Sequence, residues 1–107
     1  MTRPRIVCLC GSTRFKQEFE EAERDETLDG KIVLTVGLFG HLEGLDMVGE
    51  DKVKLDELHK RKIDLADEIL VIDVDGYVGQ STRGEIDYAA QTGKPTRYWS
   101  KERSLVG

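Results

Sequence analysis

The feature that most constrains this chain is the alternation of short apolar runs with longer, charged segments. Residues 68–74, Glu-Ile-Leu-Val-Ile-Asp-Val, form the most apolar run, and shorter runs occupy residues 5–10, 31–36 and 96–100. Runs of this length that are rich in β-branched residues are typical of strands buried on both faces of a parallel sheet. The sequence therefore predicts a strand at each of these places.

Helices are predicted between these strands, over residues 14–27, 51–66 and 81–92. Ser12 or Thr13 is available as the N-cap of the first helix. Ser81 or Thr82 is available as the N-cap of the third. The order β-α-β-α-β-α-β predicts an α/β domain of three layers, with a Rossmann-like, doubly wound parallel sheet and a strand order of about 2-1-3-4.

Length and composition exclude several classes of protein. A chain of 107 residues is expected to form a single domain over residues 1–107. Its net charge is −5 and its basic residues are scattered, whereas proteins that bind nucleic-acid polymers cluster Lys and Arg to neutralise phosphates. Residues 1–5 are too short and polar for a signal peptide, and no apolar run reaches the length of a membrane span. We expect a cytoplasmic protein with no membrane partner.

The few cysteines and histidines indicate no cofactor site. Cys8 and Cys10 are two apart in a predicted strand, a spacing poorly placed for a disulfide, and are predicted to be buried core thiols. The chain has two Cys and two His, without metal-ligand spacing, so no metal is predicted. His59 lies on the apolar arc of its helix and is predicted to be a core or interface histidine, outside the catalytic set.

Sheet topology predicts where a ligand site lies. Doubly wound sheets bind ligands beyond the carboxyl ends of the strands, at the point where strand order reverses, here between the first and third strands. The loop after the first strand contains Gly11, Ser12, Thr13 and Arg14, which offer free N–H groups, hydroxyls and a guanidinium to a phosphate or sugar. The same loop is also ordinary strand-to-helix punctuation, and this alternative stays open.

Two carboxylates flank the second loop of this predicted site. Asp73 ends the third strand and Glu85 is expected in the first turn of the next helix. Paired carboxylates suit chemistry at an anomeric carbon, where one attacks and the other orients the substrate or manages a proton. Glu85 could instead complete a capping box with Thr82, and Asp73 could be tied to loop amides. On spacing alone these structural roles are slightly favoured.

Four segments together carry a family likeness. They are Gly-Ser-Thr-Arg-Phe at 11–15, Ala-Asp-Glu-Ile-Leu-Val-Ile-Asp at 66–73, Gly-Glu-Ile-Asp-Tyr-Ala at 84–89 and Gly-Lys-Pro at 93–95. From residue 6 to about residue 99 the chain resembles the nucleoside 2-deoxyribosyltransferase-like superfamily, which includes deoxynucleoside 5′-monophosphate N-glycosidases. The resemblance implies a flavodoxin-like fold, a nucleoside or nucleotide substrate, N-glycosidic bond chemistry and a homodimer or larger assembly.

The resemblance also implies roles for individual residues. Glu85 matches the glutamate that attacks the anomeric carbon, and Asp73 matches the aspartate that contacts the substrate near the scissile bond. The loop of residues 11–14 matches the segment that holds the 5′-phosphate or sugar, and Asp75, Gly79 and Ser81 complete the expected substrate-binding set. The segment 79–84 differs in spacing from the monophosphate hydrolases, so the resemblance fixes neither the phosphate nor the base.

Other residues keep two interpretations each. Phe39 and His41, in the glycine-rich segment 37–50, and Tyr77 could contact a base or serve only packing or solvent-exposed roles. Tyr98 and Trp99 could lie at a homo-oligomer interface or in the core. The leading hypothesis is cleavage or transfer of an N-glycosidic bond by Glu85. The alternatives are a non-catalytic nucleotide-binding or sensing module and, ranked last, cleavage of the nicotinamide bond of NAD.

Overall fold

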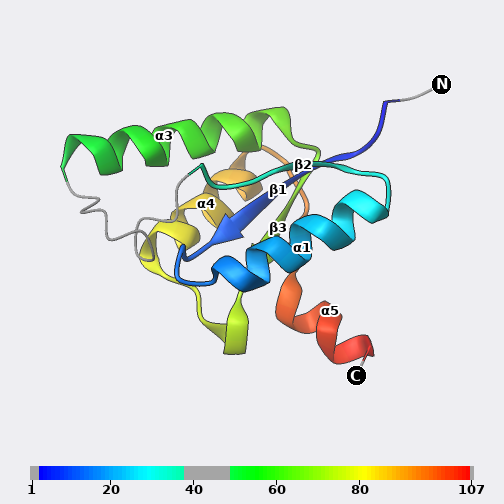
Figure 1. Ribbon diagram of the computed structural model, residues 1–107. Coiled ribbons are helices and arrows are strands. Elements are labelled where there is room, and N and C mark those ends of the chain that lie inside the picture. The colour runs from blue at the N-terminus through cyan, green and yellow to red at the C-terminus, as the bar shows by residue number, and fades with distance from the viewer. Residues whose placement is uncertain (1–2, 38–48, 107) are drawn as a thin grey trace.

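The computed structural model describes residues 3–37 and 49–106, and the side chains only as far as residue 102 (Figure 1). Its strands are β1 (Ile6–Gly11), β2 (Ile32–Leu34), β3 (Glu68–Ile72) and β4 (Thr96–Tyr98). Its helices are α1 (Lys16–Leu28), α3 (Glu50–Leu65), the short 3₁₀ helix η1 (Val74–Gly76), α4 (Gln80–Gln91) and α5 (Trp99–Val106).

The four strands form one sheet in the order β2-β1-β3-β4, and every neighbouring pair is parallel. β1 and β3 occupy the centre, and their register pairs Cys8 with Ile69 and Gly11 with Ile72. All five residues of β3 are buried, as are residues 7–10 of β1. The predicted doubly wound α/β fold and its strand order are confirmed.

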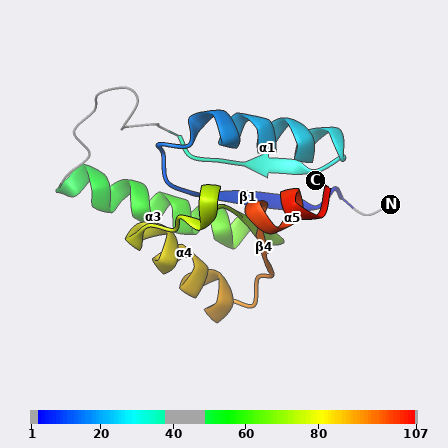
Figure 2. The ribbon, with the colours of Figure 1, turned by 90° about the horizontal axis from the view of Figure 1, so that it is seen from below.

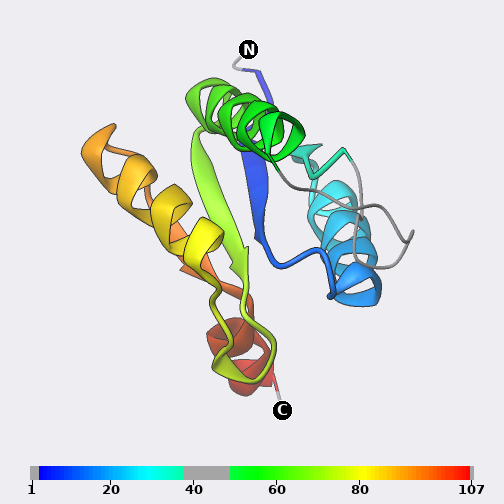
Figure 3. The same ribbon diagram turned by 90° about the vertical axis from the view of Figure 1, so that its left-hand side faces the viewer.

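The sheet separates two hydrophobic cores because successive side chains on a strand point to opposite faces. Val7 and Leu9 pack with Phe19 of α1, whereas Cys8 and Cys10 pack with Ile63 of α3. Figure 2 shows α1 on one side of the sheet and α3 and α4 on the other. Figure 3 shows the same layers from another direction, with β1 and β3 between α1 and α4. The expected three-layer arrangement is present.

Several predicted boundaries were wrong. The second strand, predicted over 31–36, is limited to Ile32–Leu34, and the fourth, predicted over 96–100, ends at Tyr98. Helix α5 follows β4 directly and was not predicted. Its turn starts at Trp99, which packs on the core beside α1, while Tyr98 packs on the core beside α3. The core-packing alternative for these two aromatic residues is therefore the one the contacts support.

The predicted N-caps were also wrong. Helix α1 starts at Lys16 with Phe15 as its N-cap, and α4 starts at Gln80 with Gly79 as its N-cap, neither with a side-chain capping bond. Ser12 instead uses its hydroxyl in the preceding turn, where Oγ accepts a hydrogen bond from the Arg14 N–H at 3.3 Å. Thr82 is buried inside α4. A hydroxyl near a helix start can bond within the turn, as Ser12 does, which is why the pattern misplaced the cap of α1.

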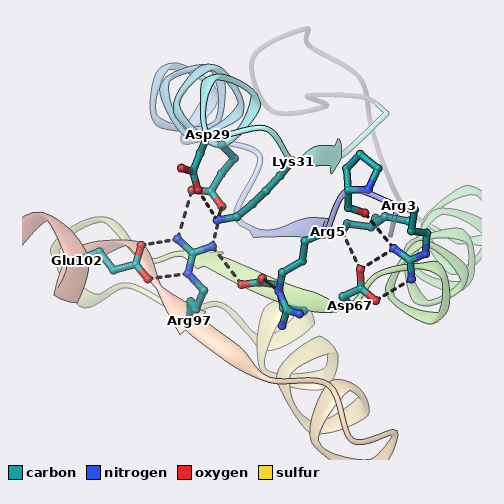
Figure 4. A network of polar contacts seen from close by, with 11 residues as sticks. Arg3, Arg5, Asp29, Lys31, Asp67, Arg97 and Glu102 are labelled. Carbon is teal, nitrogen blue, oxygen red and sulfur yellow. Dashed lines mark hydrogen bonds and ion pairs between the residues drawn. The ribbon is translucent and has the colours of Figure 1, made fainter. Parts of the chain in front are cut away.

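An ion-pair network joins the sheet to the helices on the α1 side (Figure 4). Arg97 of β4 donates to Glu26 at 2.6 Å, to Glu68 at 3.1 Å and to Glu102 at 2.7 Å. Lys31 also donates to Glu26, at 3.0 Å. Glu26 and Glu68 are buried, so these partners offset the cost of removing their charges from water. The network fixes α1, β3, β4 and α5 to one another.

No helix within residues 3–37 and 49–106 has the length and apolar character that crossing a membrane requires. The predicted aromatic and histidine candidates Phe39 and His41 lie outside the described residues.

Candidate functional site

The two predicted loops do leave the sheet side by side. β1 and β3 are parallel neighbours that end together at Gly11 and Ile72, while β2 and β4 lie on the outer sides. This is the topological switch point at which α/β sheets bind ligands. A Cβ on Gly11 would lie 2.9 Å from the carbonyl oxygen of Ile72, so only glycine allows the strands to approach this closely here.

Contacts between the two loops confirm that they face each other. The Arg14 guanidinium lies 4.5 Å from the centroid of the Tyr77 ring, and the Phe15 ring meets Tyr77 edge-on at 5.9 Å. Arg14 and Tyr77 are both exposed. Tyr77 thus brings an aromatic face and Arg14 a cation to the same part of the surface, a pair suited to a planar base or an anion.

Asp73 has defined partners in the structure. Its Oδ1 accepts a hydrogen bond from the backbone N–H of Ser100 at 2.9 Å, and its Oδ2 accepts one from the Ser100 hydroxyl at 2.8 Å. The carboxylate is buried. These bonds attach the end of β3 to the first turn of α5, which matches the structural alternative of a strand-end acid tied to a neighbouring segment. Each oxygen keeps a further lone pair that a ligand could use.

The remaining predicted binding residues are spread along the second loop. Asp75 lies in η1, is exposed and has a positive φ of 52°. Gly79 precedes α4 as its N-cap, close to the Tyr77 hydroxyl. Ser81 Oγ accepts a hydrogen bond from Lys52 Nζ of α3 at 2.9 Å. Lys52 was not among the predicted residues, although it adds a cation beside the first turn of α4.

Glu85 is not a helix cap. It follows the first residue of α4 by five positions, which places it in the second turn rather than the predicted first, and no capping bond is formed at this helix start. Its side chain is 14% exposed and points to α3, where Oε1 lies 3.9 Å from His59 Nε2. The capping-box alternative is therefore wrong, and Glu85 is a largely buried carboxylate in the core layer between α3 and α4.

His59 is the centre of a polar cluster that sequence reasoning did not identify. Its Nε2 lies 3.6 Å from Cys8 Sγ and 3.5 Å from Cys10 Sγ, and both cysteines are free and fully buried. The predictions of buried thiols and of a core histidine are confirmed. However, more than 45 residues separate His59 from the cysteines, so no local motif could show that they meet.

Burial and mutual contact shift the ionisation of this cluster. Burial raises the pKa of Glu85 to about 7, against the opposing attraction of His59. Burial lowers the pKa of His59, but the hydrogen bond with Cys8 and the charge of Glu85 outweigh it, so its pKa is raised. The bond with Cys10 and the nearby His59 lower the pKa of Cys8. Burial and the contacts within the cluster therefore move all three pKa values away from their ordinary values.

The structure thus arranges the predicted residues in two sets. Arg14 contacts the second loop through Tyr77, whereas Glu85 contacts the cluster of Cys8, Cys10 and His59. Asp73 contacts Ser100 instead of either set. A scan against protein-family models and a search of curated proteins gave no match. Support for a functional site here therefore comes from the residues of the site alone.

Proposed function

We propose that this protein cleaves or transfers the N-glycosidic bond of a nucleoside or nucleoside 5′-monophosphate, with Glu85 as the nucleophile. The observation that carries the proposal is the environment of Glu85, a largely buried carboxylate 3.9 Å from an imidazole, on the helix that follows the switch-point loop. Poorly hydrated carboxylates with raised pKa values are typical of catalytic sites. The likeness of residues 84–89 to N-glycosidic enzymes gives this carboxylate its specific role.

The ionisation of Glu85 is compatible with both halves of such a reaction. At a pKa of about 7, ionised and protonated forms are both populated near neutral pH. The ionised carboxylate attacks C1′, the bond from C1′ to the base nitrogen breaks, and the base leaves with the electron pair and takes up a proton. Water or a second base then attacks C1′ and releases Glu85.

His59 supports this role as a positioning residue. As a cation it stabilises the ionised form of Glu85, and it comes from a different helix, so it also holds the carboxylate in place. Asp73 orients the sugar in this proposal through the lone pairs that Ser100 leaves unused. Arg14, Ser12 and Ser81 are the proposed contacts of a phosphate or sugar, and Lys52 adds positive charge beside Ser81.

The test is chromatography of ribo- and deoxynucleosides and their monophosphates after incubation with the protein, with and without an acceptor base. Wild type should release free base, and Glu85→Gln should release none while keeping its circular dichroism and melting temperature. Asp87→Asn is the matched control, because Asp87 is an exposed carboxylate on the same helix. Full activity of Glu85→Gln would show that another group reacts.

A second candidate is a nucleotide-binding or sensing module without catalysis. This second function is favoured by the hydrogen bonds that Ser100 donates to both carboxylate oxygens of Asp73. These bonds explain the position of the Asp73 carboxylate without a substrate. The same panel separates the two functions. A thermal shift with a nucleotide but no product, unchanged in Glu85→Ala, would support binding alone.

A further inference from the structure

The cluster of Cys8, Cys10 and His59 has the composition of a metal site. Among the described residues, the ligand atoms of these three side chains all lie within 4.8 Å of one another. Cys8 and Cys10 occupy alternate positions on β1, so their thiols face the same side, and His59 approaches from α3. Two thiolates and an imidazole are the ligand set that zinc takes in proteins.

The distances agree with tetrahedral coordination. Zinc bonds of about 2.3 Å to sulfur and about 2.0 Å to nitrogen, at a tetrahedral angle, separate the two ligand atoms by about 3.5 Å. The observed distances from His59 Nε2 are 3.6 Å to Cys8 Sγ and 3.5 Å to Cys10 Sγ. Both sulfur atoms therefore lie at the distance from the imidazole nitrogen that a shared metal ion requires.

Glu85 is the side chain placed to complete the coordination. Its Oε1 is 3.9 Å from His59 Nε2. A tetrahedral pair of nitrogen and oxygen ligands, each about 2.0 Å from zinc, is separated by about 3.3 Å, so the Glu85 carboxylate would have to move roughly 0.6 Å closer to the imidazole nitrogen. The pKa of Cys10 is raised by Cys8 and by burial, and to a smaller extent by Glu85.

We propose that Cys8, Cys10, His59 and Glu85 bind one Zn²⁺ ion between β1, α3 and α4. Four protein ligands make a closed site that ties the centre of the sheet to two helices. A second consequence rests on the proposed function: the zinc ion binds Glu85, the carboxylate that attacks the substrate. The zinc-loaded protein is then the more stable and the less active form.

Binding is tested on the full chain after treatment with a chelator, by titrating Zn²⁺ against a chromophoric competitor and Co²⁺ by absorption spectroscopy. The expected result is one equivalent of metal and a thiolate-to-cobalt charge-transfer band. Loss of a group that hydrogen-bonds to a metal ligand weakens metal binding by about 10- to 100-fold. Loss of a ligand itself should cost more, so Cys8→Ala, Cys10→Ala and His59→Asn should each weaken zinc binding by more than about 100-fold.

Two further variants separate the ligands from the rest of the surface. Glu85→Gln should weaken zinc binding by about 10-fold or more, because the amide keeps an oxygen but loses the negative charge of the carboxylate. Asp87→Asn should bind as wild type does. Because a cysteine variant could fail to fold, the cobalt spectrum of wild type is by itself a sufficient test of whether the thiols bind the metal. Absence of a charge-transfer band, or equal affinity in the folded variants, would overturn the site.

Activity measurements keep the two proposals distinct. Base release by metal-free protein together with no zinc binding would overturn the metal site and leave the glycosidic function standing. Zinc binding with no base release from metal-free protein would overturn the function alone. Full activity with one equivalent of zinc bound would overturn the proposal that Glu85 is a zinc ligand.

Discussion

Asp73 and Ser100 form two hydrogen bonds, one from the backbone N–H and one from the hydroxyl of the serine. Since a hydrogen bond to a charged group contributes about 1.5–3 kcal/mol, Asp73→Ala should lower the free energy of unfolding by a similar amount. Ser100→Ala removes only one bond and should cost less. Denaturant unfolding of both variants measures the difference.

The same two variants also test whether Asp73 contacts a substrate. With a substrate identified, kcat/KM per folded molecule should fall in Asp73→Ala far more than in Ser100→Ala, because only the first removes the carboxylate. Equal activity in the two variants would leave Asp73 with its structural role alone.

Gly11 sets the separation between the two central strands at the proposed site. In Gly11→Ala the new Cβ would lie 2.9 Å from the Ile72 carbonyl oxygen and 3.3 Å from the Phe19 ring. Forcing a methyl group into a packed core costs about 1–3 kcal/mol. We expect a loss of that size in chemical denaturation.

Gly84→Ala is the matched control for this substitution. Gly84 lies inside α4, and a Cβ there meets no atom within 4 Å. Replacing an unstrained helix glycine by alanine should stabilise the protein by about 0.5–1 kcal/mol. Destabilisation by both substitutions to the same extent would contradict the argument from close approach.

Arg97 is the common partner of three carboxylates, two of them buried. In Arg97→Met, Glu26 would still pair with Lys31, and Glu68 would still pair with Arg5. Removing one partner of a buried ion pair costs about 3–5 kcal/mol, and a loss at the lower end is expected because part of the pairing survives. Thermal unfolding should show it, while Arg83→Met on the exposed surface of α4 should change stability by less than about 0.5 kcal/mol.

Arg3 and Asp67 give stability a dependence on pH. Hydrogen bonds from Arg3, and then from the Ile6 N–H, hold the pKa of Asp67 well below its usual range. A depressed pKa stabilises the folded state above the unfolded carboxyl pKa of about 3.9, and this contribution is lost as the pH falls towards the folded pKa. The stability difference between wild type and Arg3→Gln should therefore shrink in acid. A difference that stays the same from neutral to acidic pH would contradict this mechanism.

The order of the strands could be predicted from sequence because β1 and β3 are continuous apolar runs that only a two-sided burial explains. Helix α5 could not be predicted, since Trp99 and Ser100 directly follow a strand and the Ser100 N–H donates its hydrogen bond to Asp73, which is 27 residues away in the sequence. Glu85 was proposed as a site residue because of the family resemblance and not because of its spacing in the sequence.

The cluster around His59 illustrates a different limit. Cys8 and Cys10 are near each other in sequence, but His59 and Glu85 reach them only through the packing of α3 and α4 on one face of the sheet. Periodicity predicted that His59 points inward, and it carried no information about what it meets there. A contact of this kind depends on the tertiary arrangement of three elements.

Strand β1 supplies Cys8 and Cys10 to one core and Val7 and Leu9 to the other. Every group proposed for the metal site belongs to the first core or its border, and none belongs to the core beside α1. The core beside α1 can therefore be redesigned for greater thermal tolerance without replacing any of the four proposed zinc ligands. In this fold one central strand separates the packing beside α1 from the proposed metal site.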